Sequence, residues 1–284
     1  MTKQSLTFLE SIQSCDKILA MQDQFNPAEF PKVSIIIPTK NDAQLISGTI
    51  ESILNQNYPS YEIIIVDTST DRTVETVKSF QNDNIKVFSI PKSRRYEMLN
   101  FGISKSTGEY VNFLFPGDFY IFKETLKYMM LLAMQNQLPE LVYCGTLLRD
   151  AKSDVKILYR KFNQELLQKG QQPTSLQSSW FKRNCVVELG KFNPVYNLRG
   201  GFDLMCRFLT RDEYRIASSS RVLIDYDLRA VTRKMVVVHF METFRTVYLY
   251  FGLIAAFRWL IYQHEIKRFM KLWMHSLKIA FYGR

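Results

Sequence analysis

The chain has 284 residues, of which 46% are hydrophobic and 14% aromatic, so it can bury a full core and is not a disordered chain. Its formal net charge is +10, and ten Lys or Arg against two Asp or Glu lie between Arg229 and Arg284. The positive charge is therefore concentrated in the last fifth of the chain, which favours an anionic partner surface such as membrane headgroups or nucleic acid.

The cysteine and histidine pattern argues against zinc and disulfide chemistry. The four cysteines are scattered without a CxxC or other metal-ligand spacing, and three dispersed histidines are too few for a zinc site. We expect free thiols in a reducing compartment. Residues 1–17 lack the apolar core of a signal peptide, so the main body is expected to stay in the cytoplasm.

Residues 1–31 are predicted to form a helical lead-in that ends at Pro27 and Pro31. After it, strands and helices are predicted to alternate. Short apolar runs bounded by turn residues predict buried strands, and apolar residues at helical spacing predict the helices between them. In chain order we expect strand 33–37 closed by Pro38, helix 42–57 capped by Asp42, strand 61–67, helix 69–80, strand 85–90, helix 96–106 and strand 109–115.

This alternation predicts a doubly wound parallel sheet. In such sheets ligands bind outside the carboxyl ends of the strands. Those ends carry Pro38 and Thr39, then Asp67, and then Asp118 in the turn after the fourth strand. The glycine-rich patterns of a dinucleotide site and of a P-loop are both missing from the sequence, so neither site is expected.

The regular alternation of strands and helices ends after Asp118. Two strands are predicted to form a mixed or antiparallel region, and three further segments are predicted to be helical. The strands are 141–149 and 155–161, and the helices lie at 123–137, 175–192 and 200–211.

Four segments, taken in order, resemble the family 2 glycosyltransferases with the GT-A fold. They match the family's opening strand and corner, its first helix and second strand, its third helix and metal-binding strand, and, more weakly, its acceptor side. The segments are VSIIIPTKND (33–42), TIESILNQNYPSYEIIIVDTSTDRT (49–73), YEMLNFGISKSTGEYVNFLFPGD (96–118) and SLQSSWFKRNCVVELGKFNPVYNLRGGFDLMCRF (175–208). The resemblance covers about residues 32–210. It implies a GT-A domain over 32–228, with a mostly parallel sheet, an antiparallel acceptor-side portion and a helical tail over 229–284.

The resemblance implies that Asp118 binds a divalent cation, Mn²⁺ or Mg²⁺, which holds the diphosphate of a nucleotide-sugar. A hard cation suits carboxylate and phosphate oxygens and neutralises charge on the leaving group. Gly117 would let the diphosphate approach the backbone closely. Many members have two adjacent acids here, whereas this chain has one, in Pro-Gly-Asp. The alternative is an ordinary turn Asp that caps the next helix.

The resemblance also implies donor contacts at the ends of the first two strands. Pro38, Thr39 and Asn41 form the family's first corner, and Asp67 would bind uracil or ribose. Many members have a second acid after Asp67, where this chain has Thr68. A strand-end Asp that caps the second helix is the alternative reading of Asp67.

Arg94 and Arg95 precede the third helix, in a neighbourhood that faces the nucleotide in the family. Arginine suits base stacking and phosphate pairing, although a solvated basic loop is an equal alternative. Asn100 belongs to the same candidate set, but fixing the helix locally is the favoured interpretation for it. Trp180 could stack on an acceptor sugar, with a buried aromatic as the commoner outcome.

The resemblance points to Asp203 as the catalytic base. An inverting transfer needs a carboxylate that takes the proton of the acceptor hydroxyl. The family often provides it in a pattern like Asp-Tyr-Asp-Leu, and here the segment is GGFDL, in which Gly201 replaces the first acid. An Asp203→Asn variant would then lose turnover by about a hundredfold or more. The alternative is an Asp that stabilises a helix N-terminus.

The tail is basic and amphipathic. Only twelve residues separate Arg245 from Arg258, which is short of the roughly 20 needed to span a bilayer. Over residues 266–280 an apolar stripe lies beside lysines, which is typical of a helix in the membrane interface. We therefore expect peripheral attachment to the cytoplasmic face of the inner membrane, with packing on the protein's own core as the alternative.

The resemblance implies a metal-assisted, inverting glycosyltransferase of the hexosyltransferase type. The donor would be a nucleotide-sugar, a UDP-sugar by expectation, and the acceptor a saccharide or lipid-linked glycan in polysaccharide biosynthesis. A pseudoenzyme that serves as a partner subunit is the alternative, favoured by the single acid at Asp118, by Thr68 and by Gly201. Nucleic acid is not expected as a partner, because the sequence contains no recognised nucleic-acid motif.

Overall fold

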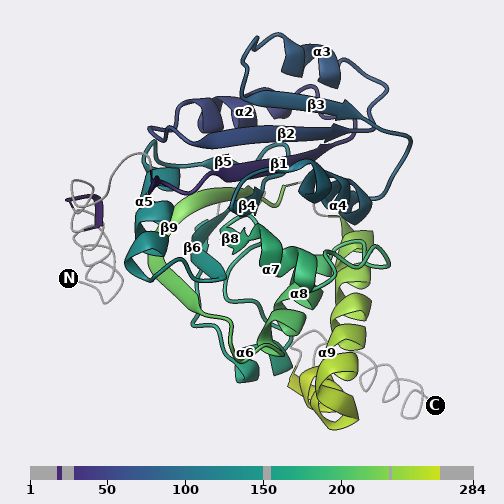
Figure 1. Cartoon of the computed structure of the whole chain (residues 1–284). Helices are drawn as coiled ribbons and strands as arrows, with labels where there is room; N and C mark the ends of the chain where they lie inside the picture. Colours follow the sequence, from purple (N-terminus) through teal and green to yellow (C-terminus); the bar gives the residue numbers. More distant parts are fainter. Residues whose placement is uncertain (1–17, 21–28, 150–154, 230–231, 263–284) are drawn as a thin grey trace.

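The computed structural model describes residues 18–20, 29–149, 155–229 and 232–262, and one mixed sheet runs through it (Figure 1). The strand order is β3-β2-β1-β4-β8-β6-β9-β5, and β7 pairs with β6. The mostly parallel sheet with an antiparallel part and a long C-terminal helix confirms the predicted fold class. Of the predicted lead-in, residues 18–20 are helical and most of the rest lies outside the described residues, as does helix 266–280.

The first half of the sheet is parallel, as predicted. Its strands pair in register, and its helices lie on both faces. The strands are β1 (Val33–Thr39), β2 (Tyr61–Asp67), β3 (Ile85–Ser89) and β4 (Tyr110–Phe113), and the helices are α2 (Ile46–Leu54), α3 (Thr73–Lys78) and α4 (Arg95–Lys105).

The inner strands of this half, β1, β2 and β4, are buried on both faces, whereas β3 at the edge is partly exposed. Ile35 and Ile37 of β1 belong to the core cluster that includes α2 and α3, whereas Ile36 between them belongs to the cluster that includes α4. Alternate side chains of a strand point to opposite faces, so a strand covered on both sides must be apolar throughout. This requirement explains the unbroken apolar runs in the sequence.

The second half is mixed. Strand β8 is antiparallel to both β4 and β6, and β9 is parallel to β6 and antiparallel to β5. The elements are β5 (Phe119–Tyr120), α5 (Thr125–Gln135), β6 (Leu141–Arg149), β7 (Val155–Leu158), α6 (Gln164–Gln168), β8 (Ser179–Lys182), α7 (Arg183–Glu188), α8 (Gly200–Leu209) and β9 (Ile216–Asp227).

Three local predictions are corrected by the structure. Strand β1 continues past Pro38, because Thr39 still pairs with Asp67 of β2. Asp42 does not cap α2, since its carboxylate accepts a hydrogen bond from the Lys40 N–H and the helix begins after Leu45. The segment 175–192 contains β8 as well as a helix. Trp180 on β8 is fully buried and stacks on Tyr120, which is the outcome that the sequence analysis favoured over stacking on an acceptor sugar.

Helix α9 (Arg233–Tyr262) forms the first part of the predicted tail. It packs against α6 and α8 and bends at Gly252, where φ is +81°. It is the one described helix that is long and apolar enough to cross a membrane by length and composition. An 18-residue stretch of it has a mean hydropathy of 1.3, and 22% of that stretch is buried. The helix therefore runs well beyond the twelve-residue apolar stretch considered from sequence.

A buried carboxylate at the amino ends of the strands gives a prediction for acid stability. Glu62 is 2% exposed and accepts hydrogen bonds from Lys86, Ser34 and Thr107. Burial raises its pKa, but these donors outweigh burial and lower the pKa to about 2. Glu62 therefore stabilises the fold above its ordinary pKa of about 4.5, and this contribution is lost as the pH falls toward 2.

We expect Glu62→Gln to flatten the acid limb of the stability curve. The wild type should lose about 3 kcal/mol of unfolding free energy through this group between pH 5 and pH 2, and the variant should not. Urea unfolding at pH 7, 4 and 3 measures this difference. The exposed Glu51→Gln is the control. Parallel pH curves for wild type and Glu62→Gln would contradict the assignment.

Candidate active site

The predicted donor corner lies at the carboxyl edge of the parallel strands, where β1 and β2 end side by side at Thr39 and Asp67. Asp67 is 2% exposed, and its carboxylate accepts from the Thr39 hydroxyl at 2.7 Å and from the Ser69 hydroxyl at 2.6 Å. The Ser69 N–H donates to its other oxygen at 2.9 Å. These three bonds leave roughly one of four acceptor positions for a ligand. Asp67 does not cap α3, because Asp71 accepts from the Thr73 N–H there.

Asn41 and Thr68 connect the two loops of this corner. Asn41 has a φ of +59°, its side-chain oxygen accepts from the Thr70 N–H, and its own N–H donates to the Ser69 hydroxyl. The Thr68 N–H donates to the Thr39 carbonyl at 3.0 Å. Pro38 is buried within β1. These residues shape the corner, and their bonds within the protein hold it in one conformation.

Asp118 lies in the turn between β4 and β5 and is 2% exposed. One carboxylate oxygen accepts from the Gln177 side-chain amide at 2.8 Å and from the Phe115 N–H at 3.3 Å, and the other accepts from the Asp227 N–H at 3.0 Å. Burial raises the pKa of Asp118 to about 7, since desolvation outweighs these hydrogen bonds. The carboxylate is thus held firmly in a place where a cation would stabilise its charge.

Asp227, at the end of β9, is a neighbour of Asp118 that the sequence did not identify. Its carboxylate is 12% exposed, pairs with Arg229 at 2.7 Å and lies 3.9 Å from Arg149. These contacts, chiefly the hydrogen bond from Arg229, lower its pKa. Arg149 also pairs with the buried Asp225 at 3.0 Å. The only signal in the sequence was the alternation Asp225-Tyr226-Asp227 at the end of an apolar run.

The Asp227 side chain lies next to Gly117 in the turn before Asp118. Gly117 has a φ of +96°, a conformation that favours glycine, and its N–H donates to the Thr49 hydroxyl. A Cβ at residue 117 would lie 3.7 Å from the nearer Asp227 carboxylate oxygen. A carboxylate oxygen from β9 therefore lies beside the turn in which the sequence has only one acid, Asp118.

Arg95 extends over the region between the first corner and the Asp118 turn. Its guanidinium lies over the Phe115 ring at 4.7 Å. Burial raises the pKa of Asp42 and of Tyr226, and Arg95 opposes both shifts, which places its charge near each. Arg94 is exposed, and its N–H donates to the Glu97 carboxylate at the start of α4. Of the two arginines, Arg95 is the one that the fold brings to the site.

Asn100 is committed to the protein itself. Its amide donates to the Phe192 carbonyl at 2.8 Å and accepts from the Phe192 N–H at 2.9 Å. Both bonds join α4 to the segment after α7. This supports the interpretation that Asn100 fixes the helix, so we leave it out of the donor site.

Asp203, which the sequence predicts to be the catalytic base, is buried and already paired in this structure. It is 2% exposed, and one oxygen accepts from Arg207 at 2.7 Å while the other accepts from the Tyr250 hydroxyl at 2.9 Å. A base must reach the acceptor hydroxyl, whereas this carboxylate is buried between α8 and α9 and already paired. Its spacing from Arg207, four residues along a helix, was a sequence signal for a structural ion pair.

The residues around Asp118 fit a divalent cation that is shared with a substrate. Among the described residues, no group of three or more His, Cys, Asp and Glu could hold a metal by itself. Mg²⁺ and Mn²⁺ are commonly bound by one or two carboxylates together with phosphates and water. Asp118, with Asp227 beside it, is a donor set of that size.

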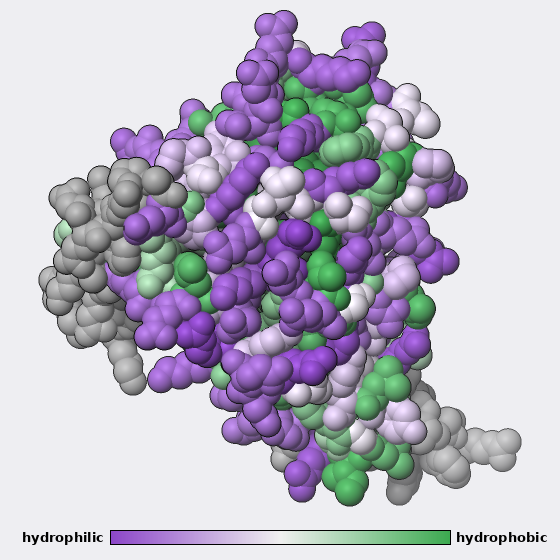
Figure 2. All heavy atoms as spheres, viewed as in Figure 1, coloured by the Kyte–Doolittle hydropathy of each residue, from purple (hydrophilic) through white to green (hydrophobic). Residues whose placement is uncertain are grey.

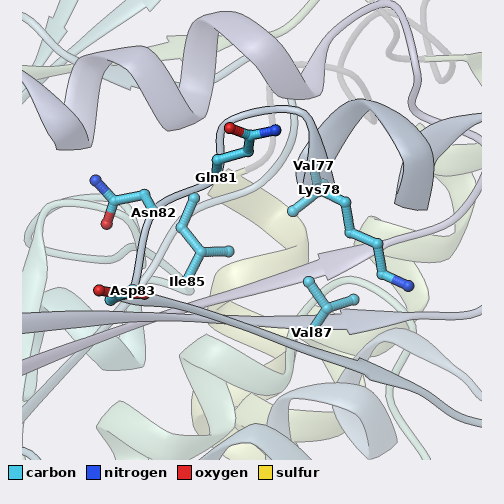
Figure 3. Close-up of a pocket in the computed structure, with 7 residues that line it drawn as sticks. All are labelled: Val77, Lys78, Gln81, Asn82, Asp83, Ile85 and Val87. Carbon is cyan, nitrogen blue, oxygen red and sulfur yellow. The ribbon is translucent and has the colours of Figure 1, made fainter.

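A shallow depression elsewhere does not belong to this site. It encloses about 250 Å³ between the end of α3 and the start of β3, and is lined by residues such as Lys78, Asn82 and Asp83 (Figure 3). It therefore lies at the amino end of β3, whereas the site lies at the carboxyl ends.

Comparison with known proteins identifies the family of the chain. The profile of the family described as Glycosyl transferase family 2 matches residues 34–191. An uncharacterised glycosyltransferase of Rickettsia typhi is 34% identical over 123 residues, which are 43% of this chain and 39% of that protein. This chain therefore matches about two fifths of the length of that relative.

Two solved structures share the fold. Staphylococcus aureus TarS 1–349 in complex with UDP-GlcNAc has a TM-score of 0.61 at 17% identity, over 76% of this chain and 66% of that one. A mannosyltransferase from Pyrobaculum calidifontis in complex with GDP-Man and Mn²⁺ has a TM-score of 0.58 at 17% identity, over 97% of this chain and 90% of that one.

Proposed function

The chain belongs to glycosyl transferase family 2, and from this membership we propose that it transfers a hexose from a UDP-sugar, with inversion, to a saccharide or lipid-linked acceptor. The observation that supports this proposal most strongly is the place of Asp118. It is a buried carboxylate at the carboxyl edge of the parallel sheet, with Asp227 and Arg95 nearby. That edge is where α/β folds bind their ligands.

We assign the donor groups to residues that the fold brings to this edge. Asp118, with Asp227 beside it, would hold the divalent cation, which when bound neutralises charge on the departing diphosphate. Arg95 offers a planar cation to the nucleotide or its phosphates. Asp67 offers its remaining acceptor position to the base or ribose, and Gly117 keeps the backbone accessible. Arg94 stays a candidate contact from the exposed side.

The basic tail is the basis of our proposal for the acceptor and for the location of the enzyme. We propose that residues 229–284 attach the protein peripherally to the cytoplasmic face of the membrane, where a lipid-linked or growing surface glycan would be available. The concentration of basic residues in this part of the chain supports that proposal.

A second candidate function is retained because of Asp203. Since the predicted base is buried and paired, a catalytically inactive member that serves as a partner subunit is the rival of the enzyme. Donor binding without turnover would identify the partner subunit, whereas turnover would identify the enzyme.

The test is a thermal-shift screen of nucleotide-sugars, each with and without Mn²⁺, followed by an assay of UDP release. We expect a UDP-sugar to raise the melting temperature more with Mn²⁺ than without it, and to release UDP when an acceptor is added. If no nucleotide-sugar stabilises the protein under either condition, the proposed function is wrong.

Arg95→Ala is expected to weaken UDP-sugar binding by about tenfold, the effect of losing one charge-assisted contact of roughly 1.5 kcal/mol. Titration calorimetry with UDP measures the change. The exposed Lys92→Ala three residues earlier is the control and should bind like the wild type. Equal affinity of Arg95→Ala and wild type would remove Arg95 from the donor site.

A further inference from the structure

Helix α9 carries most of the exposed apolar surface of the described chain. Of the fifteen large hydrophobic side chains that are exposed there, nine lie on this helix. Figure 2 shows hydrophobic side chains gathered at the lower end of the molecule, where α9 bends in Figure 1. Contiguous exposed apolar surface of this kind marks an interaction site.

The segment after the bend at Gly252 has the most exposed face. Leu253, Ile254, Phe257 and Ile261 are 55%, 74%, 51% and 63% exposed. Their spacing of one, four and eight residues places them on one side of a helix. Arg258 is also exposed, four residues after Ile254 and three before Ile261, so a positive charge accompanies this face.

The segment before the bend repeats the pattern. Val237, Met241 and Tyr248 are 62%, 60% and 48% exposed and lie on one side of the helix. Lys234 and Arg245 are exposed on the same side, three residues before Val237 and four after Met241. Both halves of α9 therefore present apolar side chains with basic residues among them.

No acidic side chain interrupts this face within α9. The one acidic residue of the helix, Glu242, turns toward the protein, where its carboxylate accepts from the N–H groups of Leu198 and Arg199 at 2.9 and 2.8 Å. The exposed face is therefore purely apolar and basic. An anionic lipid surface matches that combination, because acyl chains accept the apolar groups and headgroup phosphates accept the basic ones.

The opposite face of α9 is fixed to the protein. Val247, Ala256 and Trp259 are buried, and the Tyr250 hydroxyl donates to Asp203 at 2.9 Å. A helix held along one side by the protein core cannot leave to span a bilayer, so contact in the plane of the membrane is the mode that the packing allows. A second copy of this chain is a poorer occupant, because a symmetric contact would bring like charges such as Arg245 and Arg258 together.

Extending the peripheral attachment proposed above, we propose that the exposed apolar face of α9 after the bend at Gly252 lies in the interface of an anionic bilayer, with the axis of that segment along the membrane. Leu253, Ile254, Phe257 and Ile261 enter the boundary of the acyl chains. Lys234, Arg245 and Arg258 meet the headgroup phosphates. The helix thus docks the folded domain directly, in addition to anything that residues 263–284 contribute.

The test is flotation of the full chain with vesicles of phosphatidylcholine alone or with 30% phosphatidylglycerol added, a fraction of roughly the anionic content that attracts basic segments. We expect binding to the anionic vesicles, and at least a tenfold loss of binding for Ile254→Glu with Phe257→Glu and for Arg245→Gln with Arg258→Gln. The matched control is Ile157→Glu on β7, a side chain 63% exposed, which should bind like the wild type.

Three results would overturn the proposal: no binding by the wild type, unchanged binding by both double variants, or a wild-type dimer that the apolar double variant dissociates without losing vesicle binding. If that variant fails to fold, quenching by brominated lipids is measured instead on Ile254→Trp, against Ile157→Trp. Quenching must be stronger at residue 254. UDP release with a soluble acceptor is measured on the same proteins, so loss of docking is distinguished from failure of the proposed activity.

Discussion

Asp118→Asn is expected to lower metal-dependent turnover of the UDP-sugar by about 10³-fold, the scale of losing a main electrostatic stabiliser of the leaving group. The variant keeps the size of the side chain and one oxygen that can accept from Gln177 or from Asp227. It loses the negative charge that a divalent cation requires. Mn²⁺ should then no longer increase the thermal stabilisation produced by UDP.

The thermal stability of Asp118→Asn should not fall as its turnover does. Burial raises the pKa of Asp118 to about 7, above its ordinary value, so its charge opposes folding and stability falls as the pH rises through 7. At pH 8 the Asn variant should therefore melt at the same temperature as the wild type or higher. The exposed Asp83→Asn is the control for both measurements. Full Mn²⁺-dependent activity in Asp118→Asn would show that this carboxylate does not hold the cation.

Asp203→Asn is expected to damage the fold and spare the chemistry. The change removes the counter-charge of Arg207, whose side chain is only 20% exposed. It also leaves the Tyr250 hydroxyl with an amide in place of a carboxylate. Breaking a largely buried ion pair from one side costs about 3 kcal/mol. Turnover per folded molecule should stay within about threefold of the wild type, since a carboxylate paired with Arg207 and Tyr250 is not free to take the acceptor proton.

Two measurements separate these effects. Urea unfolding gives the change in stability, and UDP release at a temperature where both proteins are folded gives turnover. Asp212→Asn, exposed in the turn after α8, is the control. A hundredfold loss of turnover with an unchanged unfolding midpoint would restore Asp203 as the base and show that α9 moves away from it during catalysis.

The parallel half of the fold could be predicted from local patterns alone. Strands that are covered on both faces leave unbroken apolar runs, as in Ile35 to Ile37, and the helices between them show apolar periodicity. Strand β9 left no such signal, because Ile216 and Ala217 at its start are followed by three serines and Arg221, and an apolar run begins only at Val222. Its place beside β6 and β5 is decided by tertiary pairing.

The residues of the candidate site likewise include some that local sequence patterns place and others that only tertiary pairing places. Thr39, Asp67 and Asp118 follow strands that the sequence identifies, so their position at one edge could be predicted. Asp227 is 109 residues from Asp118 in the chain and meets it through the pairing of β9, which no local pattern reveals. The role of Asp203 could not be predicted from sequence, because an acid near the start of a helix looks the same whether it faces a substrate or an arginine.

The contacts of Glu242 and Tyr250 have a practical consequence for preparing the protein. A chain cut before Arg233 would remove the carboxylate that accepts the Leu198 and Arg199 N–H groups and the hydroxyl that meets Asp203. The start of α8 would then lose its partners, and Tyr196 would lose the Thr246 hydroxyl that donates to it at 2.9 Å. Truncation aimed at solubility should therefore begin after Tyr262, since trimming further back removes contacts that hold the start of α8.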